Sequence, residues 1–387
     1  LWLAWDRGTA GIDASVEARN VVASPADDSW QLPLQHLSFT ASLVERRDRR
    51  VLFASNLQLQ QGATVARLPR LQLDAWDKSV RLRAQAVDVE PLNQLLLGLD
   101  SVPPRLLDVL AVLAPRGSLD ALQVSIGDIT APARDWSVEG NFSGLAVESW
   151  RGAPGVTNGR GYVDLTPGGG YVVMDSQQFT MDFPTVYREP LFYDDFHGTL
   201  NLGWDSDGLL LDSGAITAQA AEGTATALFR LNIPFHPTET GLEMDLMVGL
   251  SDSHPVHRVK YVPYTLNEGL LDWLAGSIGE GNVEQAGFIW RGSLRRGAAD
   301  MRTVQLFLNV RNTALDYHPG WPPVSGVEGI VLIDDTNISV WAERARLFES
   351  EVRRLSAEAW MNPSGQMMLG IQGDVSGSAA DGLRAVN

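Results

Sequence analysis

Cysteine is absent from this sequence, histidine is scarce, and no hydrophobic run is long. The absence of cysteine excludes a disulfide scaffold, Cys-based zinc sites and thiol catalysis, and it fits an oxidising compartment such as a periplasm. No segment reaches the roughly 18 apolar residues of a membrane-spanning helix, because charged residues and prolines interrupt even the stretch 92–114. The sequence has no signal peptide, begins at Leu1 rather than Met and stops at Asn387 after turn-like residues, so we expect an internal part of a longer protein.

Basic residues are also scarce relative to acidic ones. The chain has 30 Lys and Arg against 47 Asp and Glu, which gives a formal net charge of −17. That balance repels a phosphate backbone, and no basic patch with interleaved aromatic residues is present, so the composition argues against nucleic-acid binding. A hydrophobic content of 44% argues against disorder, and 387 residues suit two domains or one extended repeat body.

Constellations that would carry chemistry are missing as well. The closest pair of histidines, His254 and His257, flanks a proline in a predicted loop. The carboxylate pairs 194–195 and 334–335 point to opposite faces if they lie on strands, and both are interpreted as turn residues. Phosphate-loop, serine-hydrolase and zinc-helix motifs are absent. The sequence therefore predicts no catalytic, cofactor-binding or metal-binding residue and no enzymatic activity.

Alternation of apolar and polar residues dominates what is present. Residues 242–250, 304–310 and 225–235 each place apolar side chains at every second position, and shorter runs continue the pattern towards the N-terminus. A period of two predicts strands with one apolar face. Glycine, aspartate, asparagine and proline gather between these runs and predict turns. The stretch 341–361 has a composition that favours helix, but its alternation favours strand, and we predict strand.

One hairpin frame recurs along the chain. A proline precedes a short loop, a glycine opens an alternating run, and a second alternating run follows a polar turn. The copies begin near Pro154, Pro190 and Pro323, with their glycines at 161, 198 and 329. Repetition of one supersecondary unit predicts an array that grows strand by strand.

Two stretches break the alternation and predict short helices. Residues 91–117 carry leucines at helical spacing in two segments, and a capping box at Thr265 and Glu268 opens a second helical stretch. We therefore expect a β-hairpin array over 1–90, a short helical insertion over 91–117, and a continuing β-body over 118–387 with a helix at 265–276.

Several segments resemble one known family. The run 261–292, with its Leu/Trp helix followed by Phe288-Ile289-Trp290-Arg291-Gly292, the run 310–322 and the element at 113–119 are similar to the AsmA-like proteins of Gram-negative bacteria, closest to their YhdP type. The resemblance covers roughly residues 91–387. Its motifs indicate the fold of the family and include no catalytic residues.

The resemblance implies a bridge-like lipid-transfer protein. Its fold would be mainly β: an elongated, twisted, antiparallel repeating β-groove, open like a folded taco, with a few short helices. It would lie in the periplasm, anchored to the inner membrane through an N-terminal helix outside this sequence, and would conduct phospholipids towards the outer membrane. Its partners would be phospholipid acyl chains and the two membranes, with no cofactor and no nucleic acid.

The alternating runs supply candidate residues for such a groove. An apolar face can shelter acyl chains, each CH₂ of which costs about 0.8 kcal/mol in water. The predicted lining is Phe229, Leu231, Ile233, Leu242, Met244, Leu246, Val248, Leu306, Leu308 and Val310, and the predicted groove-bordering helix contributes Leu266, Leu270, Trp273 and Leu274. Alternation alone also fits a closed core. Two other functions therefore stay open: a structural or adhesive extracytoplasmic β-repeat protein, and a carbohydrate-binding β-protein.

Overall fold

The computed structural model describes residues 2–6, 9–24, 31–46, 48–99, 104–253, 263–264, 268–277, 279, 281–316 and 321–386. These residues form a mainly β fold of 22 strands with a few short helices, which confirms the predicted fold class. The chain divides into two compact units. The first comprises residues 1–181 and 199–205, and the second comprises residues 182–198 and 206–387. The predicted boundaries at 90 and 117 stay a prediction.

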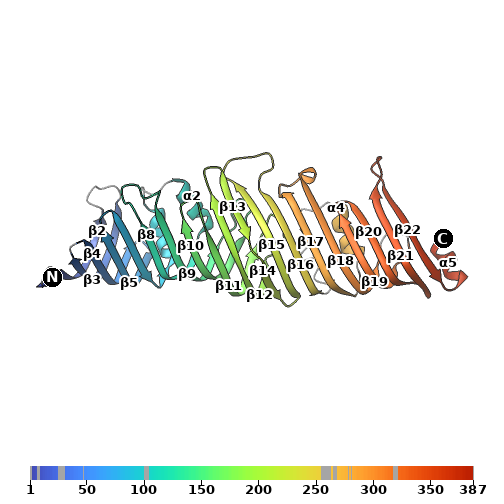
Figure 1. The fold of residues 1–387 in the computed structure, drawn as a ribbon, viewed down its shortest axis with the longest axis horizontal. Coiled ribbons are helices and arrows are strands. Elements are labelled where there is room, and N and C mark those ends of the chain that lie inside the picture. Colours follow the sequence, from blue (N-terminus) through green and yellow to red (C-terminus); the bar gives the residue numbers. More distant parts are fainter. Residues whose placement is uncertain are drawn as a thin grey trace. The chain divides into compact units, whose positions relative to one another are not determined.

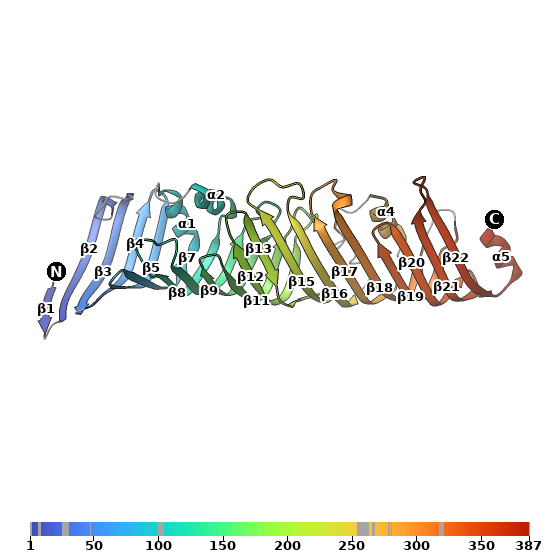
Figure 2. The same ribbon diagram turned by 45° about the horizontal axis from the view of Figure 1, so that its top comes forward.

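In the first unit, strands β1 to β6 pair antiparallel in sequence order, β6 and β7 both pair with β8, and β8 to β10 continue the same order (Figure 1). The strands are β1 (Trp2–Asp6), β2 (Thr9–Ala23), β3 (Leu32–Arg46), β4 (Arg49–Gln61), β5 (Thr64–Trp76), β6 (Ser79–Gln85), β7 (Val87–Asp88), β8 (Arg116–Ile126), β9 (Trp136–Val147), β10 (Gly155–Thr166) and β11 (Gly169–Asp182). The helices α1 (Val89–Leu97) and α2 (Pro104–Leu113) separate β7 from β8 and lie at the upper ends of the strands in Figure 2.

The second unit repeats the same antiparallel order from β14 to β22. Its strands are β12 (Leu191–Trp204, shared with the first unit), β13 (Gly208–Ser213), β14 (Ile216–Ala220), β15 (Gly223–Pro234), β16 (Glu243–Ser253), β17 (Asn282–Ser293), β18 (Arg302–Leu315), β19 (Val324–Asp334), β20 (Asn337–Leu347), β21 (Ser350–Met361) and β22 (Met367–Ser376). Its helical segments are α4 (Glu268–Ser277), the 3₁₀ turn η2 (Ala299–Met301) and α5 (Ala379–Val386).

The glycine of the recurring hairpin frame has a steric cause. A Cβ placed on Gly161 would meet the carbonyl oxygen of Val173, and one on Gly329 would meet that of Trp341. A Cβ on Gly198 would lie 2.6 Å from Cγ1 of Ile216. The neighbouring strand thus approaches each frame position too closely for any other residue.

Left-handed residues inside strands bend the sheet. Asn56 in β4 and Ala121 in β8 have φ values of 55° and 52°, and each lies at a shift in strand register. Ala86, with φ of 52°, separates β6 from β7. In the second unit, Asn312 and Gly326 have the same role in β18 and β19. Such bulges bend a strand and increase its twist, so each unit curls at these positions.

Three predictions about local structure had different outcomes. The stretch 341–361 is strand, as predicted, and forms the end of β20 and the whole of β21. The turn interpretation of the pair 334–335 is confirmed for Asp335, which follows the end of β19 and whose carboxylate accepts a hydrogen bond from the Val304 amide at 2.7 Å. Asp334 is instead the last residue of β19. The turn interpretation of the pair 194–195 is wrong: both residues lie inside β12, where Asp195 is in register with Gln219.

Candidate functional site

The predicted lining residues of the second unit come to one face of the sheet. Leu246 on β16 is in register with Phe229 on β15 and with Trp290 on β17. Val248 lies two residues further along the same face and is in register with Phe288, which pairs in turn with Leu306 on β18. Because side chains alternate along a strand, direct register partners share a face. The apolar rows therefore cross β15–β18 without a break.

The exposure of this apolar face varies along it. Leu231, Ile233, Met244, Leu308 and Val310 are buried. Leu308 and Val310 belong to a packed core that β18–β21 share. Phe229, Leu242, Leu246, Val248 and Leu306 are only half-buried, and Leu242 lies just before β16. Part of the face is thus core, and part remains accessible to a ligand.

Charged side chains occupy the opposite face of the same strands. Arg230 is in register with Asp245, and Asp245 with Arg291. Arg230 pairs with Asp212 at 2.7 Å, and Arg291 Nε lies 3.4 Å from Asp245 Oδ1. All these side chains are partly exposed, so each pair contributes little to stability, but the row keeps this face hydrated.

The predicted groove-bordering helix exists as α4, over Glu268–Ser277. Of its four predicted contact residues, Leu266 lies outside the described residues, and the side chains of Leu270, Trp273 and Leu274 lie outside the described part of the helix. Their groove-bordering role stays a prediction.

The first unit carries an apolar row that sequence reasoning left out of the candidate site. Six consecutively paired strands place large aliphatic side chains in register: Ile12, Leu43, Leu52, Leu73, Leu82 and Val124. All six are half-buried. The alternation at 71–73 and 80–86 was the available signal, but alternation does not reveal which strands lie in line.

Helix α1 packs against this apolar face. Leu92 contacts a small cluster formed by Leu68, Ala84 and Val87, with Leu71 and Leu122 at its edge. The next residue, Asn93, is buried, and its amide donates to the Leu110 carbonyl of α2 at 3.4 Å. Leu96 and Leu97 remain 41% and 37% exposed on the outer side of α1. The helix thus covers part of the apolar row and leaves the rest open.

The other face of the first unit is polar and carries a groove of about 1050 Å³. Each of eight strands from β2 to β10 contributes to it, most of them through three consecutive residues such as Asp13–Ser15, Arg70–Gln72 and Arg83–Gln85. The outer two residues of a trio share one face, and the middle residue points to the other. Tyr162, the lone contribution of β10, donates to Glu139 Oε2 at 3.1 Å, which places the groove on the polar face.

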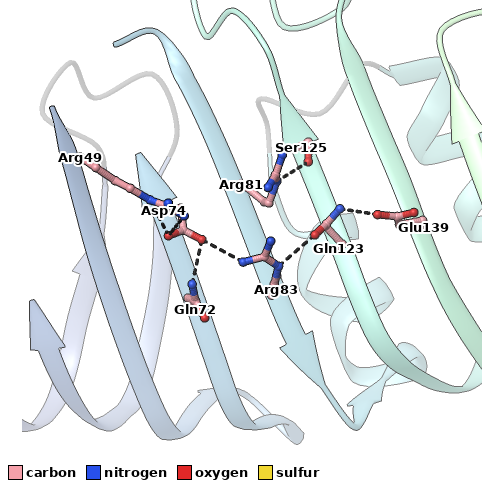
Figure 3. A network of polar contacts seen from close by, with 8 residues as sticks. All are labelled: Arg49, Gln72, Asp74, Arg81, Arg83, Gln123, Ser125 and Glu139. Carbon is pink, nitrogen blue, oxygen red and sulfur yellow. Dashed lines mark hydrogen bonds and ion pairs between the residues drawn. The ribbon is translucent and has the colours of Figure 1, made fainter. Parts of the chain in front are cut away.

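Asp74 is the centre of a polar network beside this groove (Figure 3). Its side chain has no exposed surface, and Arg49 Nη2 donates to its Oδ1 at 2.6 Å. Gln72 and Arg83 donate to its other oxygen at 2.9 Å and 3.3 Å. The guanidinium groups of Arg49 and Arg81 lie over the Trp76 ring. This carboxylate is therefore fully paired, as a buried charge must be.

The network continues across the sheet from Arg83. Its Nε donates to Gln123 Oε1 at 2.9 Å, and Gln123 donates in turn to Glu139. Glu139 also accepts from the Tyr162 hydroxyl, and burial, followed by this hydrogen bond, raises the pKa of Tyr162 to about 12. Four strands are thereby linked through side chains, and the geometry of one groove wall is fixed.

Metal ligands do not gather in the part of the chain that the structure describes, where no three His, Asp or Glu side chains are placed to hold an ion. His254 and His257, the closest pair of histidines in the sequence, lie outside it. Within the same described ranges, no helix has the length and apolarity to cross a membrane.

Comparison with known proteins identifies the family. The model of the YhdP protein family matches residues 1–387. This chain belongs to the YhdP family. The intermembrane phospholipid transporter YhdP of Escherichia coli K12 is 23% identical over 322 residues, which cover 81% of this chain. The chain spans about a quarter of the length of that YhdP protein. No solved structure matches the chain.

Proposed function

We propose that this chain carries phospholipids by sheltering their acyl chains on its apolar face, without making or breaking bonds. The observation that carries the proposal is the set of aliphatic rows in direct register, from Ile12 to Val124 in the first unit and across β15–β18 in the second. The similar Escherichia coli protein is a phospholipid transporter, which supports a lipid as the cargo.

The energetics favour a continuous apolar surface. Moving an acyl chain through water costs about 0.8 kcal/mol for each exposed CH₂, and an apolar row removes most of that barrier at every step. The half-buried residues, such as Leu82 and Leu246, are the ones an acyl chain can reach. Buried residues such as Val310 support them from within the core. Head groups stay hydrated at the border of the apolar face.

The cellular setting belongs to the proposal. Because the similar protein is named as intermembrane, we propose a periplasmic location between the inner and outer membranes, with attachment through parts of the longer protein outside this sequence. The half-buried members of the predicted lining, together with the predicted contact residues of the helical stretch 265–276, are the proposed contacts for acyl chains.

Photo-crosslinking tests the proposal residue by residue. A benzophenone side chain at position 246 is expected to capture phospholipid, because Leu246 lies on the half-buried apolar face. The matched control is position 245, the adjacent residue on the opposite, charged face. Mass spectrometry should find lipid adducts at 246 and not at 245. Equal adducts at both positions, or none at 246 and at Leu82, would contradict the proposal.

A further inference from the structure

The groove on the polar face of the first unit is a long track rather than a pocket. It crosses eight strands, and neighbouring strands lie about 4.8 Å apart, so it extends on the order of 35 Å. Two rows of side chains flank a floor of strand backbone. In one row Ser42, Phe53 and Gln72 are direct register partners, and in the other Thr40, Ser55 and Arg70 are.

The walls of the groove present mostly uncharged hydrogen-bonding groups. Serine, threonine, glutamine and asparagine side chains contribute from seven of its strands. Arg83 and Glu139 are already engaged within the network, so their charges are offset. Because these groups hold one another in place, they can bond a ligand without first losing much conformational freedom.

The other wall offers unused donors. Arg70 and Gln85 are exposed and in direct register, and the described residues provide neither side chain with a hydrogen-bond or ion-pair partner. An exposed guanidinium and an adjacent amide together supply several N–H donors in fixed planes. Such groups suit vicinal hydroxyl or acetamido oxygens.

An exposed aromatic ring completes the site. Phe53 is 47% exposed and stands in the wall between Ser42 and Gln72. The C–H face of a pyranose ring packs well on an aromatic face, and an exposed ring among polar side chains favours a sugar over a protein. Protein interfaces need a larger apolar centre than one phenyl ring.

We propose that this groove binds a single strand of a linear, uncharged polysaccharide. The spacing of the strands is close to the length of one hexose in an extended chain, so successive strands can each address one sugar. The net charge of −17 disfavours a polyanionic glycan. Within the first unit the site lies on the face opposite the apolar row from Ile12 to Val124, so it is separate from the proposed lipid surface of that unit.

Calorimetric titration of the whole chain tests this inference, with cellohexaose and chitohexaose as probes and polygalacturonate as the charged comparison. We expect binding of at least one uncharged hexasaccharide and weaker binding of the polyuronate. Phe53→Ala and Arg70→Ala should each lower the affinity by about tenfold. Arg67→Ala is the control for Arg70, because Arg67 is exposed on the same strand but outside the groove. Phe192→Ala, which removes a 61% exposed ring from β12, is the control for Phe53.

Each outcome bears on the proposal. The proposal is overturned if neither uncharged probe binds at millimolar concentration. It is also overturned if wild type and both groove variants bind with equal affinity, or if the protein prefers the polyuronate. A photo-crosslinker at position 53 that captures only a protein in periplasmic extract would do so as well. Circular dichroism on every variant separates lost binding from lost folding.

Discussion

Arg49 Nη2 lies 2.6 Å from Oδ1 of Asp74, a carboxylate whose side chain has no surface exposed to solvent. The two residues come from adjacent strands, β4 and β5, and Arg83 on β6 reaches the other carboxylate oxygen. One buried charge thus links three strands through their side chains, in addition to the backbone ladders that join them.

Removal of this carboxylate should destabilise the first unit. In Asp74→Ala, two guanidinium groups lose their shared partner, and loss of one member of a buried pair costs about 3 kcal/mol. Because Arg49 and Arg83 are 46% and 42% exposed, water should recover part of that loss. Urea denaturation followed by tryptophan fluorescence should show a clearly lower midpoint.

The control is Glu17→Ala. Glu17 and Arg19 form an exposed pair at 3.9 Å, which should contribute less than about 1 kcal/mol. If both variants lower the urea midpoint equally, the buried Asp74 network stabilises the protein no more than an exposed ion pair does.

The bulge at Ala121 gives a prediction of opposite sign. Ala121 has φ of 52°, a conformation that costs an L-residue about 1 kcal/mol and glycine almost nothing. Ala121→Gly should therefore stabilise the protein. Ala54→Gly, at a regular strand position in the same region, should destabilise it by about 0.5 to 1 kcal/mol. Thermal unfolding of both variants checks the signs, and a lower melting temperature for Ala121→Gly would contradict the account of the bulge.

Much of the fold follows from the sequence, because period-two alternation is a local property. The strand at 341–361 was predicted correctly against its helical composition, since Leu355, Ala357 and Ala359 alternate. The pair 194–195 was misassigned because aspartates favour turns, yet both residues lie within β12, where Asp194 is exposed. Two short helices were predicted in this region and α1 and α2 are present, although α1 begins two residues before Pro91.

The polar groove could not be predicted in the same way. Its rows join residues as distant in sequence as Asp13 and Gln123, and their alignment depends on register. The bulges at Asn56 and Ala121 shift that register by a residue, and neither has a distinctive local sequence signal. The sequence did contain one clue to the network. An acidic residue, Asp74, lies on one alternating run, and two basic residues, Arg81 and Arg83, lie at alternate positions on the next run.

The raised pKa of Tyr162 makes stability depend on pH at the alkaline end. The folded pKa, about 12, lies above the ordinary value of 10.0, so the native state retains a proton that the unfolded chain releases. This contribution is intact below pH 10 and is lost as the pH rises from 10 towards 12. Tyr162→Phe should flatten that part of the stability curve, measured as the urea midpoint against pH. Tyr171→Phe, which changes the neighbouring ring 6.1 Å away, is the comparison. Identical curves for wild type and Tyr162→Phe would contradict the prediction.

The last prediction separates the accessible part of the apolar face from its core. Leu308 is 8% exposed and packs within the core of β18–β21, so a carboxylate there has no route to water. Leu308→Asp should unfold or aggregate the protein, because desolvation of an unpaired charge costs several kcal/mol.

Leu246 is half-buried, and a charge at that position can remain partly hydrated. Leu246→Asp should therefore fold, as judged by circular dichroism, but lose the lipid adducts formed at position 248. Met247→Asp is the control: Met247 is 54% exposed on the opposite face, and its variant should fold and keep those adducts. If Leu246→Asp also unfolds, the whole face is packed core and cannot hold an acyl chain. If it folds and retains lipid, the acyl chains run elsewhere on the sheet.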